Sequence, residues 1–359
     1  MFKSISIKSF RCFEDFSIDS LNRVNLITGK NSVGKTALLE AIFLLIGAEN
    51  LSLVGKISHF RGIREFSGDL SSILELLWTS LFYNLEIGRK IYIDGELIEG
   101  KSHNVELFLT PVASQKLDLN SENGTDIQLK SRDLSTQILN QKHTDPSGNI
   151  SKFEMKVING KLIIEPAPVS PPFPGYFLSA QRPLGLEEDN NIYGRLVKAK
   201  QSYIKNILKV MKFVEPRIEN LASIQSAGVS MIYGDIGLNQ MLPLSLMGDG
   251  MLRLASILLR IADASGGIVL IDEIENGLHY SILNDVWQAI GKAANIFKTQ
   301  IFATTHSYEC IIAAHNAFRK SDDYDFGLHR LDRINEKIEV VTYNQKTLTN
   351  AIKADFEVR

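Results

Sequence analysis

Residues 29–36 read Gly-Lys-Asn-Ser-Val-Gly-Lys-Thr, and this short stretch decides how the whole chain is interpreted. It has the spacing GxxxxGK[ST], in which two glycines precede a lysine and a hydroxyl side chain. An apolar run at residues 24–28 precedes it, and a helix is predicted from Lys35 to about Ile46. Between a strand and a helix, such a turn directs backbone N–H groups toward phosphate oxygens. The stretch therefore predicts a phosphate-binding loop.

Each residue type in this loop has a role in holding a nucleotide. Backbone N–H groups would surround the phosphates, the lysine would reach the terminal ones, and the threonine hydroxyl would bind Mg²⁺. The residues predicted to contact the nucleotide are Gly29, Lys30, Asn31, Ser32, Val33, Gly34, Lys35 and Thr36, with Thr36 also a predicted metal ligand. The chain lacks the Asn-Lys-x-Asp motif that reads guanine, which favours ATP over GTP.

Two acids close the apolar strand predicted at residues 268–271. Asp272 and Glu273 follow that strand directly. Asp272 would hold hydrated Mg²⁺, and Glu273 would polarise the water that attacks the γ-phosphate. A strand ending in two acids is common in α/β proteins. The two acids therefore indicate an ATPase only in combination with the phosphate-binding loop, beside which they are predicted to lie.

Two further elements each have an ordinary structural alternative. His306 follows the apolar strand at residues 300–303, where it could sense a γ-phosphate or simply cap the next helix. The turn Gly248-Asp249-Gly250 opens a helix, so its N–H groups could contact a phosphate or merely form a helix N-terminus. Neither element is decisive alone.

The order of these four elements is that of ABC-type ATPases. The chain resembles the AAA15/AAA21 group of standalone ABC ATPases, which is related to the heads of RecF, SMC and Rad50 proteins and to the ATPase half of OLD-family nucleases. The matching stretches are IKSFRCFEDF, GKTALLEAI, LMGDGMLRL, IDEIENGLH, FATTHS and DFEVR. They lie in residues 1–47 and 240–359, and the middle of the chain matches only in general character.

This resemblance implies an α/β fold, namely an ABC-type P-loop ATPase head in which helices flank a mixed sheet. It implies hydrolysis of ATP with Mg²⁺ as cofactor, with Glu273 and His306 as catalytic residues. Arg11 resembles residues that other heads place near the nucleotide, although an exposed arginine in a strand is the alternative. Gln181, after the strand predicted at residues 176–179, is a candidate Mg²⁺ ligand.

The resemblance also implies an assembly. In ABC heads the signature turn, here Gly248, Asp249 and Gly250, contacts the nucleotide of an opposing head, so a homodimer or a higher even-numbered assembly is expected. The signature departs from the Leu-Ser-Gly-Gly-Gln of transporters because residues 247–251 read Met-Gly-Asp-Gly-Met. Without the serine hydroxyl, the contact would rest on backbone N–H groups, and a transporter role is disfavoured.

Four segments are expected along the chain. Residues 1–87 form the N-terminal lobe with the P-loop, and residues 241–359 form the C-terminal lobe with the signature, the two acids and the histidine. Residues 88–175 are predicted as a β-rich insertion because the pairs Asp94-Gly95, Asn123-Gly124 and Asn159-Gly160 mark turns. Residues 176–240 are predicted to hold one strand and a helical segment, with an amphipathic helix over about residues 192–211.

Composition limits the partners. The net charge is -2, so contact with DNA would need a local patch. At helical spacing, one side of the helix at 192–211 would carry such a patch or an ordinary solvated face; its members are Arg195, Lys198, Lys205, Lys209 and Lys212. No long apolar run and no signal peptide are found, so a cytoplasmic protein that does not enter the membrane is expected.

The resemblance suggests two functions. The first is an ATP-gated switch that regulates a separately encoded effector, such as a Toprim nuclease or a toxin, in bacterial anti-phage defence or DNA maintenance. A separate effector is expected because the 359 residues leave no room after the histidine for the Toprim domain of OLD nucleases. The alternative is a stand-alone DNA-structure sensor or repair ATPase of RecF/SMC type, for which the lysine patch is the sequence support.

Overall fold

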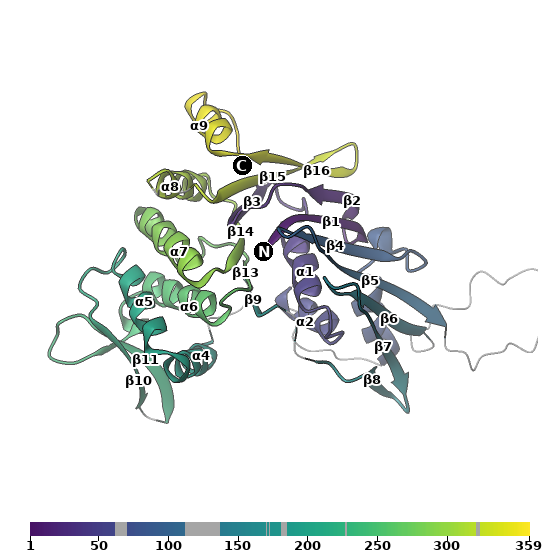
Figure 1. Cartoon of the computed structure of the whole chain (residues 1–359), viewed down its shortest axis with the longest axis horizontal. Coiled ribbons are helices and arrows are strands. Elements are labelled where there is room, and N and C mark those ends of the chain that lie inside the picture. Colours follow the sequence, from purple (N-terminus) through teal and green to yellow (C-terminus); the bar gives the residue numbers. More distant parts are fainter. Residues whose placement is uncertain are drawn as a thin grey trace, which may run out of the picture.

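A six-stranded, mostly parallel sheet forms the centre of the molecule (Figure 1). The computed structural model describes residues 1–61, 70–111, 137–169, 171, 173–180, 185–226, 228–320 and 324–359. Across the sheet the strands are β16 (Lys337–Tyr343), β15 (Phe326–Ile334), β3 (Val24–Gly29), β14 (Gln300–Thr304), β13 (Ile268–Ile271) and β9 (Gly175–Leu178). All neighbours pair in parallel except β15 and β16. The carboxyl ends of β3, β14 and β13 therefore meet, where ligands of such sheets bind.

A seven-stranded antiparallel sheet lies beside the first. Across it the strands are β2 (Phe13–Ile18), β1 (Phe2–Phe10), β4 (Ile91–Leu97), β5 (Ser102–Pro111), β6 (Gln137–Thr144), β7 (Ile150–Ile158) and β8 (Lys161–Glu165). Residues 88–175 are thus rich in strands. However, β4 pairs with β1, so these strands extend a sheet that begins at the N-terminus. The strands of the predicted β-rich insertion at 88–175 therefore continue the sheet of the N-terminal lobe.

The three predicted turns of this segment have different outcomes. Asn159-Gly160 joins β7 to β8, and both residues have positive φ, as a two-residue hairpin requires. Asp94-Gly95 lies inside strand β4 instead, where a Cβ on Gly95 would come within 2.5 Å of the Phe2 ring. Glycine there allows close packing and makes no turn. Asn123-Gly124 lies outside the described residues.

Helix α1 (Lys35–Ile46) is packed between the two sheets. It contacts β3, β13, β14 and β9 on one side and β4 and β5 on the other. Nearly all of its residues are buried, which explains why its sequence is apolar all round. Short helical elements lie near it: α2 (Leu53–Phe60), α3 (Leu70–Leu74), the π-helix η1 (Glu75–Thr79) and the 3₁₀ helix η2 (Tyr83–Leu85).

Helices also cover the other face of the six-stranded sheet, which confirms the predicted α/β fold of a mixed sheet flanked by helices (Figure 1). They are α6 (Asp249–Asp263), α7 (Leu283–Phe297) and α8 (Tyr308–Arg319). Smaller elements complete this half: β10 (Asn220–Ser226), β11 (Val229–Asp235), β12 (Leu242–Pro243), η4 (Leu244–Leu246), η5 (Tyr280–Ile282) and α9 (Gln345–Lys353). In the described part of the chain, no helix has the length and apolar character that crossing a bilayer requires.

The helix predicted over residues 192–211 is two helices. They are α4 (Leu186–Ala199) and α5 (Gln201–Met211), and the break falls at Lys200, whose backbone is extended with φ -161°. Helical spacing cannot be carried across that residue, so the predicted single face was wrong. In α4, Val197 is exposed and Leu196 is buried.

Candidate functional site

The loop between β3 and α1 has a backbone that only glycine accommodates easily. Gly29 has φ +134°, and a Cβ there would lie 2.3 Å from the carbonyl oxygen of Leu331. Gly34 has φ +99°, and a Cβ there would lie 2.5 Å from Cys12 Sγ. Both glycines therefore satisfy the packing requirement of a tight phosphate-binding turn.

The Lys35 side chain is folded back over this loop. Its Nζ donates hydrogen bonds to the carbonyl oxygens of Gly29, at 2.6 Å, and Lys30, at 2.9 Å. Burial lowers the pKa of Lys35 to about 8, while the charges of Asp272, Glu273 and Glu275 oppose that shift. A phosphate in the loop would restore the electrostatic stabilisation that burial removes from the ammonium group.

Asp272 follows β13 and lies against two threonines. Its Oδ1 accepts a hydrogen bond from Thr304 Oγ1 at 2.7 Å, and its Oδ2 lies 3.2 Å from Thr36 Oγ1. Burial raises the pKa of the Asp272 carboxyl, whereas the hydrogen bonds from Thr304 and Thr36 lower it. A carboxylate and a hydroxyl this close are hard oxygen ligands of the kind that Mg²⁺ prefers, so the residues fit the ion that the sequence predicts.

Glu273 is held in a strained backbone conformation beside the histidine. Its φ is +48°, and its N–H donates to Thr304 Oγ1 at 2.8 Å. Its side chain accepts a hydrogen bond from Asn276 Nδ2 at 2.8 Å and lies 3.6 Å from His306 Nε2. Backbone strain of this type is concentrated at functional sites. The structure therefore brings Glu273 and His306, which are 33 positions apart in the chain, to one place.

These groups surround a cavity of about 740 Å³. Its described lining residues are Arg11, Cys12, Asn31, Ser32, Gly34, Lys35, Thr36, Ala37, Arg61, Ser80, Phe82, Asn84, Leu85, Glu273 and His306. Residues of the P-loop, Glu273 and His306 thus line the same cavity. A volume of this size suits a nucleotide.

Sequence reasoning missed the residue that orients the arginines of this cavity. Glu40, fully buried on α1, accepts hydrogen bonds from Arg11 Nε at 3.1 Å and from Arg61 Nε at 2.6 Å. Arg11 also donates to the Ser80 carbonyl oxygen at 2.8 Å. A charged residue in the middle of the apolar GKTALLEAI helix was the signal that could have revealed Glu40, because buried carboxylates require partners.

The signature turn lies away from this cavity. Gly248 precedes α6 with φ +107°, and none of Gly248, Asp249 and Gly250 is among the cavity's described lining residues. No atom of the described residues lies within 4 Å of a Cβ built on Gly248, so among these residues the turn faces open space. Gln181, the second predicted Mg²⁺ ligand, lies outside the described residues.

A P-loop, a strand ending in two acids and a histidine at the end of the neighbouring strand define an ATPase of the ABC class. The chain belongs to the family described as AAA domain, putative AbiEii toxin, Type IV TA system, whose model matches residues 97–311. The AAA ATPase domain model matches residues 1–165. The chain is therefore an ABC-type ATPase related to RecF and SMC proteins, as its resemblance implied.

Several known proteins are similar to this chain. An ATP/GTP phosphatase of Helicobacter pylori is 25% identical over 352 residues, which cover 90% of each chain. Structural maintenance of chromosomes protein 6 of Saccharomyces cerevisiae is 31% identical over 137 residues, which are 38% of this chain and 11% of that protein. The SMC head domain from Thermotoga maritima is a structural neighbour with 14% identity and a TM-score of 0.46, covering 96% of this chain and 99% of that one.

Proposed function

We propose that the chain is an ATP-gated switch in which two heads pair face to face over two nucleotides. The observation that carries this proposal is the separation of the signature turn from the P-loop cavity. Since Gly248 faces open space, its turn can reach a bound phosphate only in a second copy. Each nucleotide site would then be built from the P-loop of one head and the signature of the other.

The proposed roles follow from the contacts. Lys35 would exchange its two loop carbonyls for the terminal phosphates, and Thr36 and Asp272 would hold Mg²⁺. When bound, the metal would neutralise charge on the phosphates. Glu273 would orient and deprotonate the attacking water, and His306 would contact the γ-phosphate. Arg11, fixed by Glu40, would add a positive charge on the opposite wall of the cavity.

Exposed apolar side chains beside the signature support pairing with a second copy. Leu246, two residues before Gly248, is 72% exposed. Tyr280, which follows the Asp272–His279 segment, is 70% exposed. Gly250 contacts the region around Tyr280, because a Cβ on Gly250 would lie 3.0 Å from Ile282 and 3.7 Å from the carbonyl oxygen of Gly277. Large exposed apolar side chains favour a protein interface.

We further propose that this switch is cytoplasmic and regulates a separately encoded nuclease or toxin in bacterial anti-phage defence or DNA maintenance. The toxin part is supported by the description of its family as AAA domain, putative AbiEii toxin, Type IV TA system.

Mixing two inactive variants tests the shared sites. Lys35→Ala keeps the signature, and Gly248→Arg keeps the P-loop, so a mixed pair retains one intact site. Each variant alone should be inactive, and an equal mixture should regain up to roughly a quarter of wild-type turnover, because random pairing makes half of the pairs mixed. Steady-state phosphate release measures this.

The control for the mixture is Gly248→Ala. Alanine must adopt the same positive φ as arginine at this position, so it introduces the same backbone strain, but it lacks the long side chain. Gly248→Ala should hydrolyse ATP much faster than Gly248→Arg. If the mixture stays as inactive as its components while both variants remain folded and Gly248→Arg binds ATP, the heads do not share their sites.

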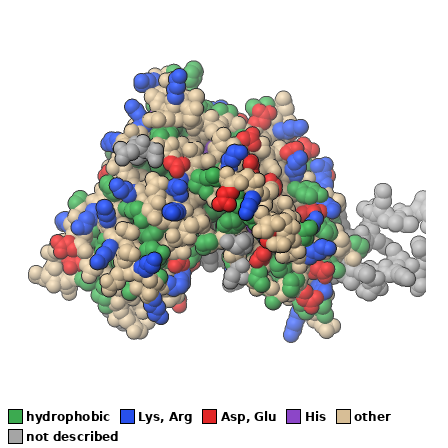
Figure 2. Space-filling view, viewed as in Figure 1, with side chains coloured by type: hydrophobic (Ala, Val, Ile, Leu, Met, Phe, Trp, Pro, Cys, Tyr) green, Lys and Arg blue, Asp and Glu red, His purple; other side chains and the backbone are tan. Residues whose placement is uncertain are grey.

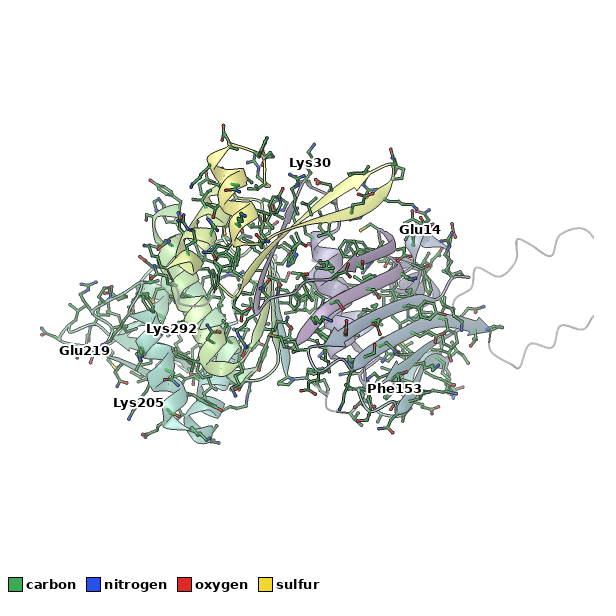
Figure 3. All side chains as sticks on the ribbon, turned by 45° about the horizontal axis from the view of Figure 1, so that its top comes forward. Glu14, Lys30, Phe153, Lys205, Glu219 and Lys292 are labelled. Atoms are coloured by element: carbon green, nitrogen blue, oxygen red, sulfur yellow. The ribbon has the colours of Figure 1, made fainter. Side chains whose placement is uncertain are left out.

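A second candidate function is DNA binding, and the lysines of α5 favour it. Lys205, Lys209 and Lys212 are exposed at helical spacing, and Lys292 of α7 is exposed on the same side (Figure 3). Lys and Arg side chains gather over the face formed by α5 and α7 (Figure 2). Arg195 is not counted in this face, because its guanidinium is already paired with Asp263.

Reversing the three α5 charges, in Lys205→Glu, Lys209→Glu and Lys212→Glu together, should weaken DNA binding. It should also flatten the salt dependence, by roughly 0.9 in the log-log slope for each lost phosphate contact. Binding is measured by fluorescence anisotropy between low and moderate salt. The matched control reverses three exposed lysines of the seven-stranded sheet region, Lys101, Lys152 and Lys161. Equal loss in both triple variants, or no binding by the wild type, would rule out this face.

A further inference from the structure

Glu275 holds the backbone of the histidine that faces the catalytic acid. Its Oε1 accepts a hydrogen bond from the His306 N–H at 2.8 Å. Its other oxygen, Oε2, is buried and has no hydrogen-bond partner in the described structure. A buried carboxylate oxygen without a partner is costly, and the cost is removed if a donor reaches it in another state of the protein.

Arg253, on α6, carries the opposite charge to Glu275 and also has buried polar atoms without partners. Its side chain is buried, with 6% of the residue exposed, and its Nε and one of its terminal nitrogens lack partners in the described part of the chain. Burial lowers the pKa of Arg253 and the nearby Arg260 lowers it further, while Asp189, Asp272 and Glu275 raise it. An unpaired guanidinium inside a protein destabilises the state that contains it.

Arg253 lies on α6 and Glu275 lies in the segment that follows the two acids, and these two elements are in contact. A Cβ on Gly250 would lie 3.7 Å from the carbonyl oxygen of Gly277, and Arg253 is one helical turn further along the same side of α6. Glu275 is two residues before Gly277 in the facing segment. The signature turn begins the same helix at Gly248.

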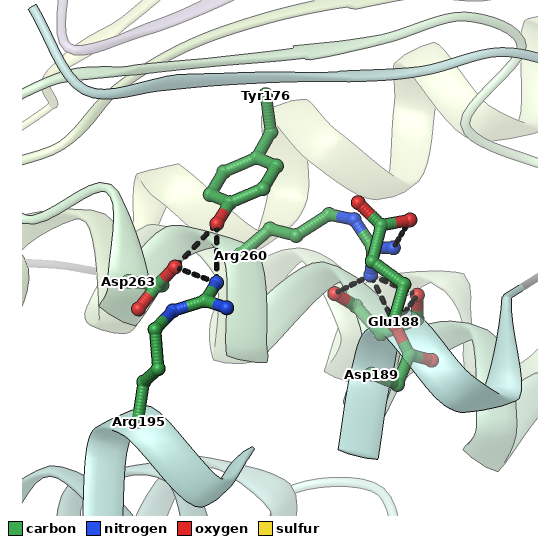
Figure 4. A network of polar contacts seen from close by, with 7 residues as sticks. Tyr176, Glu188, Asp189, Arg195, Arg260 and Asp263 are labelled. Carbon is green, nitrogen blue, oxygen red and sulfur yellow. Dashed lines mark hydrogen bonds and ion pairs between the residues drawn. The ribbon is translucent and has the colours of Figure 1, made fainter. Parts of the chain in front are cut away.

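The other carboxylates near Arg253 are already engaged. Asp189 pairs with Arg260 and accepts a hydrogen bond from Ser256 (Figure 4). Asp272 accepts hydrogen bonds from Thr36 and Thr304. Glu275 is therefore the carboxylate with a free buried oxygen on that side of α6 among the described residues.

We infer that Glu275 is a positioning residue for His306 and that Arg253 becomes its ion-pair partner when α6 moves, so that the signature turn is coupled to the histidine through these two side chains. The inference rests on the proposed function, in which an opposing nucleotide contacts the signature. A shift of α6 toward residues 275–278 would bring the guanidinium to Oε2. That pairing would fix the Glu275 carboxylate and, through its other oxygen, the position of His306.

Replacing Arg253 with methionine is expected to change stability and turnover in opposite directions. Arg253→Met should raise the melting temperature of the nucleotide-free protein, by about 3 °C, because an unpaired buried charge is replaced by an apolar side chain. It should lower kcat about tenfold and leave ATP affinity within about twofold of wild type. The matched control is Arg260→Met on the same helix, which should lower the melting temperature because it removes the ion-pair partner of the buried Asp189 carboxylate.

Glu275 is tested by two substitutions that differ in one property. Glu275→Gln keeps an oxygen that can accept from the His306 N–H but loses the charge, whereas Glu275→Ala loses both. If the ion pair with Arg253 matters, the Gln variant should lose about tenfold in kcat. In the double variant Arg253→Met with Glu275→Gln, kcat should be about tenfold below wild type and not about a hundredfold, because both changes remove the same ion pair.

Turnover of Arg253→Met or Glu275→Gln equal to wild type would overturn the inference, and so would a double variant whose losses multiply. These outcomes differ from a failure of the proposed function. That failure would appear in the wild type and in the Lys35→Ala and Gly248→Arg mixture, whatever happens at Arg253. A normal mixture with an unaffected Arg253→Met variant would reject the coupling alone.

Discussion

Replacing Lys35 with alanine is expected to abolish measurable ATP turnover and to weaken ATP binding by about a hundredfold. The Lys35 ammonium is the buried cation of the P-loop, and its Nζ lies within 3 Å of two loop carbonyls whose places the phosphates would take. In a site shielded from water, the loss of this contact leaves the triphosphate charge largely uncompensated. Binding of a fluorescent ATP analogue and phosphate release measure both effects.

The control for this prediction is the neighbouring lysine of the same loop. Lys30 is exposed and takes part in the contacts described above only through its backbone carbonyl, so Lys30→Ala should change affinity by less than about threefold. Lys35→Ala should also remain folded, because removing a buried ammonium group costs little packing. Unchanged affinity and turnover in a folded Lys35→Ala variant would remove the P-loop assignment.

The second large effect is expected from Glu273→Gln, which should bind ATP normally and hydrolyse it at least about a hundredfold more slowly. The amide has the shape of the carboxylate and can still accept a hydrogen bond from Asn276, but it cannot accept a proton from water. Single-turnover hydrolysis separates this loss from any change in binding. Near-normal turnover would mean that another residue acts as the base.

Much of the site could be predicted because local sequence determines it. The loop at residues 29–36, helix α1 and the two acids after β13 depend on spacing and on the order of a strand, a turn and a helix. Their convergence follows from the parallel pairing of β3, β14 and β13, which places the carboxyl ends of the strands together. These elements were predicted with the residue ranges that the structure has, within one or two positions.

The remaining features depend on contacts between distant parts of the chain. The pairing of β4 with β1 joins residues about 90 positions apart, and no local pattern encodes it. The break at Lys200 was missed because the flanking residues keep helical spacing on each side. Glu40 with its two arginines, and the unpartnered buried atoms of Arg253 and Glu275, likewise become visible only once the helices are packed.

Light scattering of Glu273→Gln measures whether ATP joins two heads. Blocked hydrolysis should trap the joined state, so addition of ATP and Mg²⁺ should double the mass or produce a higher even-numbered assembly. The same protein carrying Gly248→Arg in addition should bind ATP without this change, whereas the Gly248→Ala control should still assemble. A mass of Glu273→Gln that is the same with and without ATP, or assembly that persists with Gly248→Arg, would show that ATP does not join two heads through the signature turn.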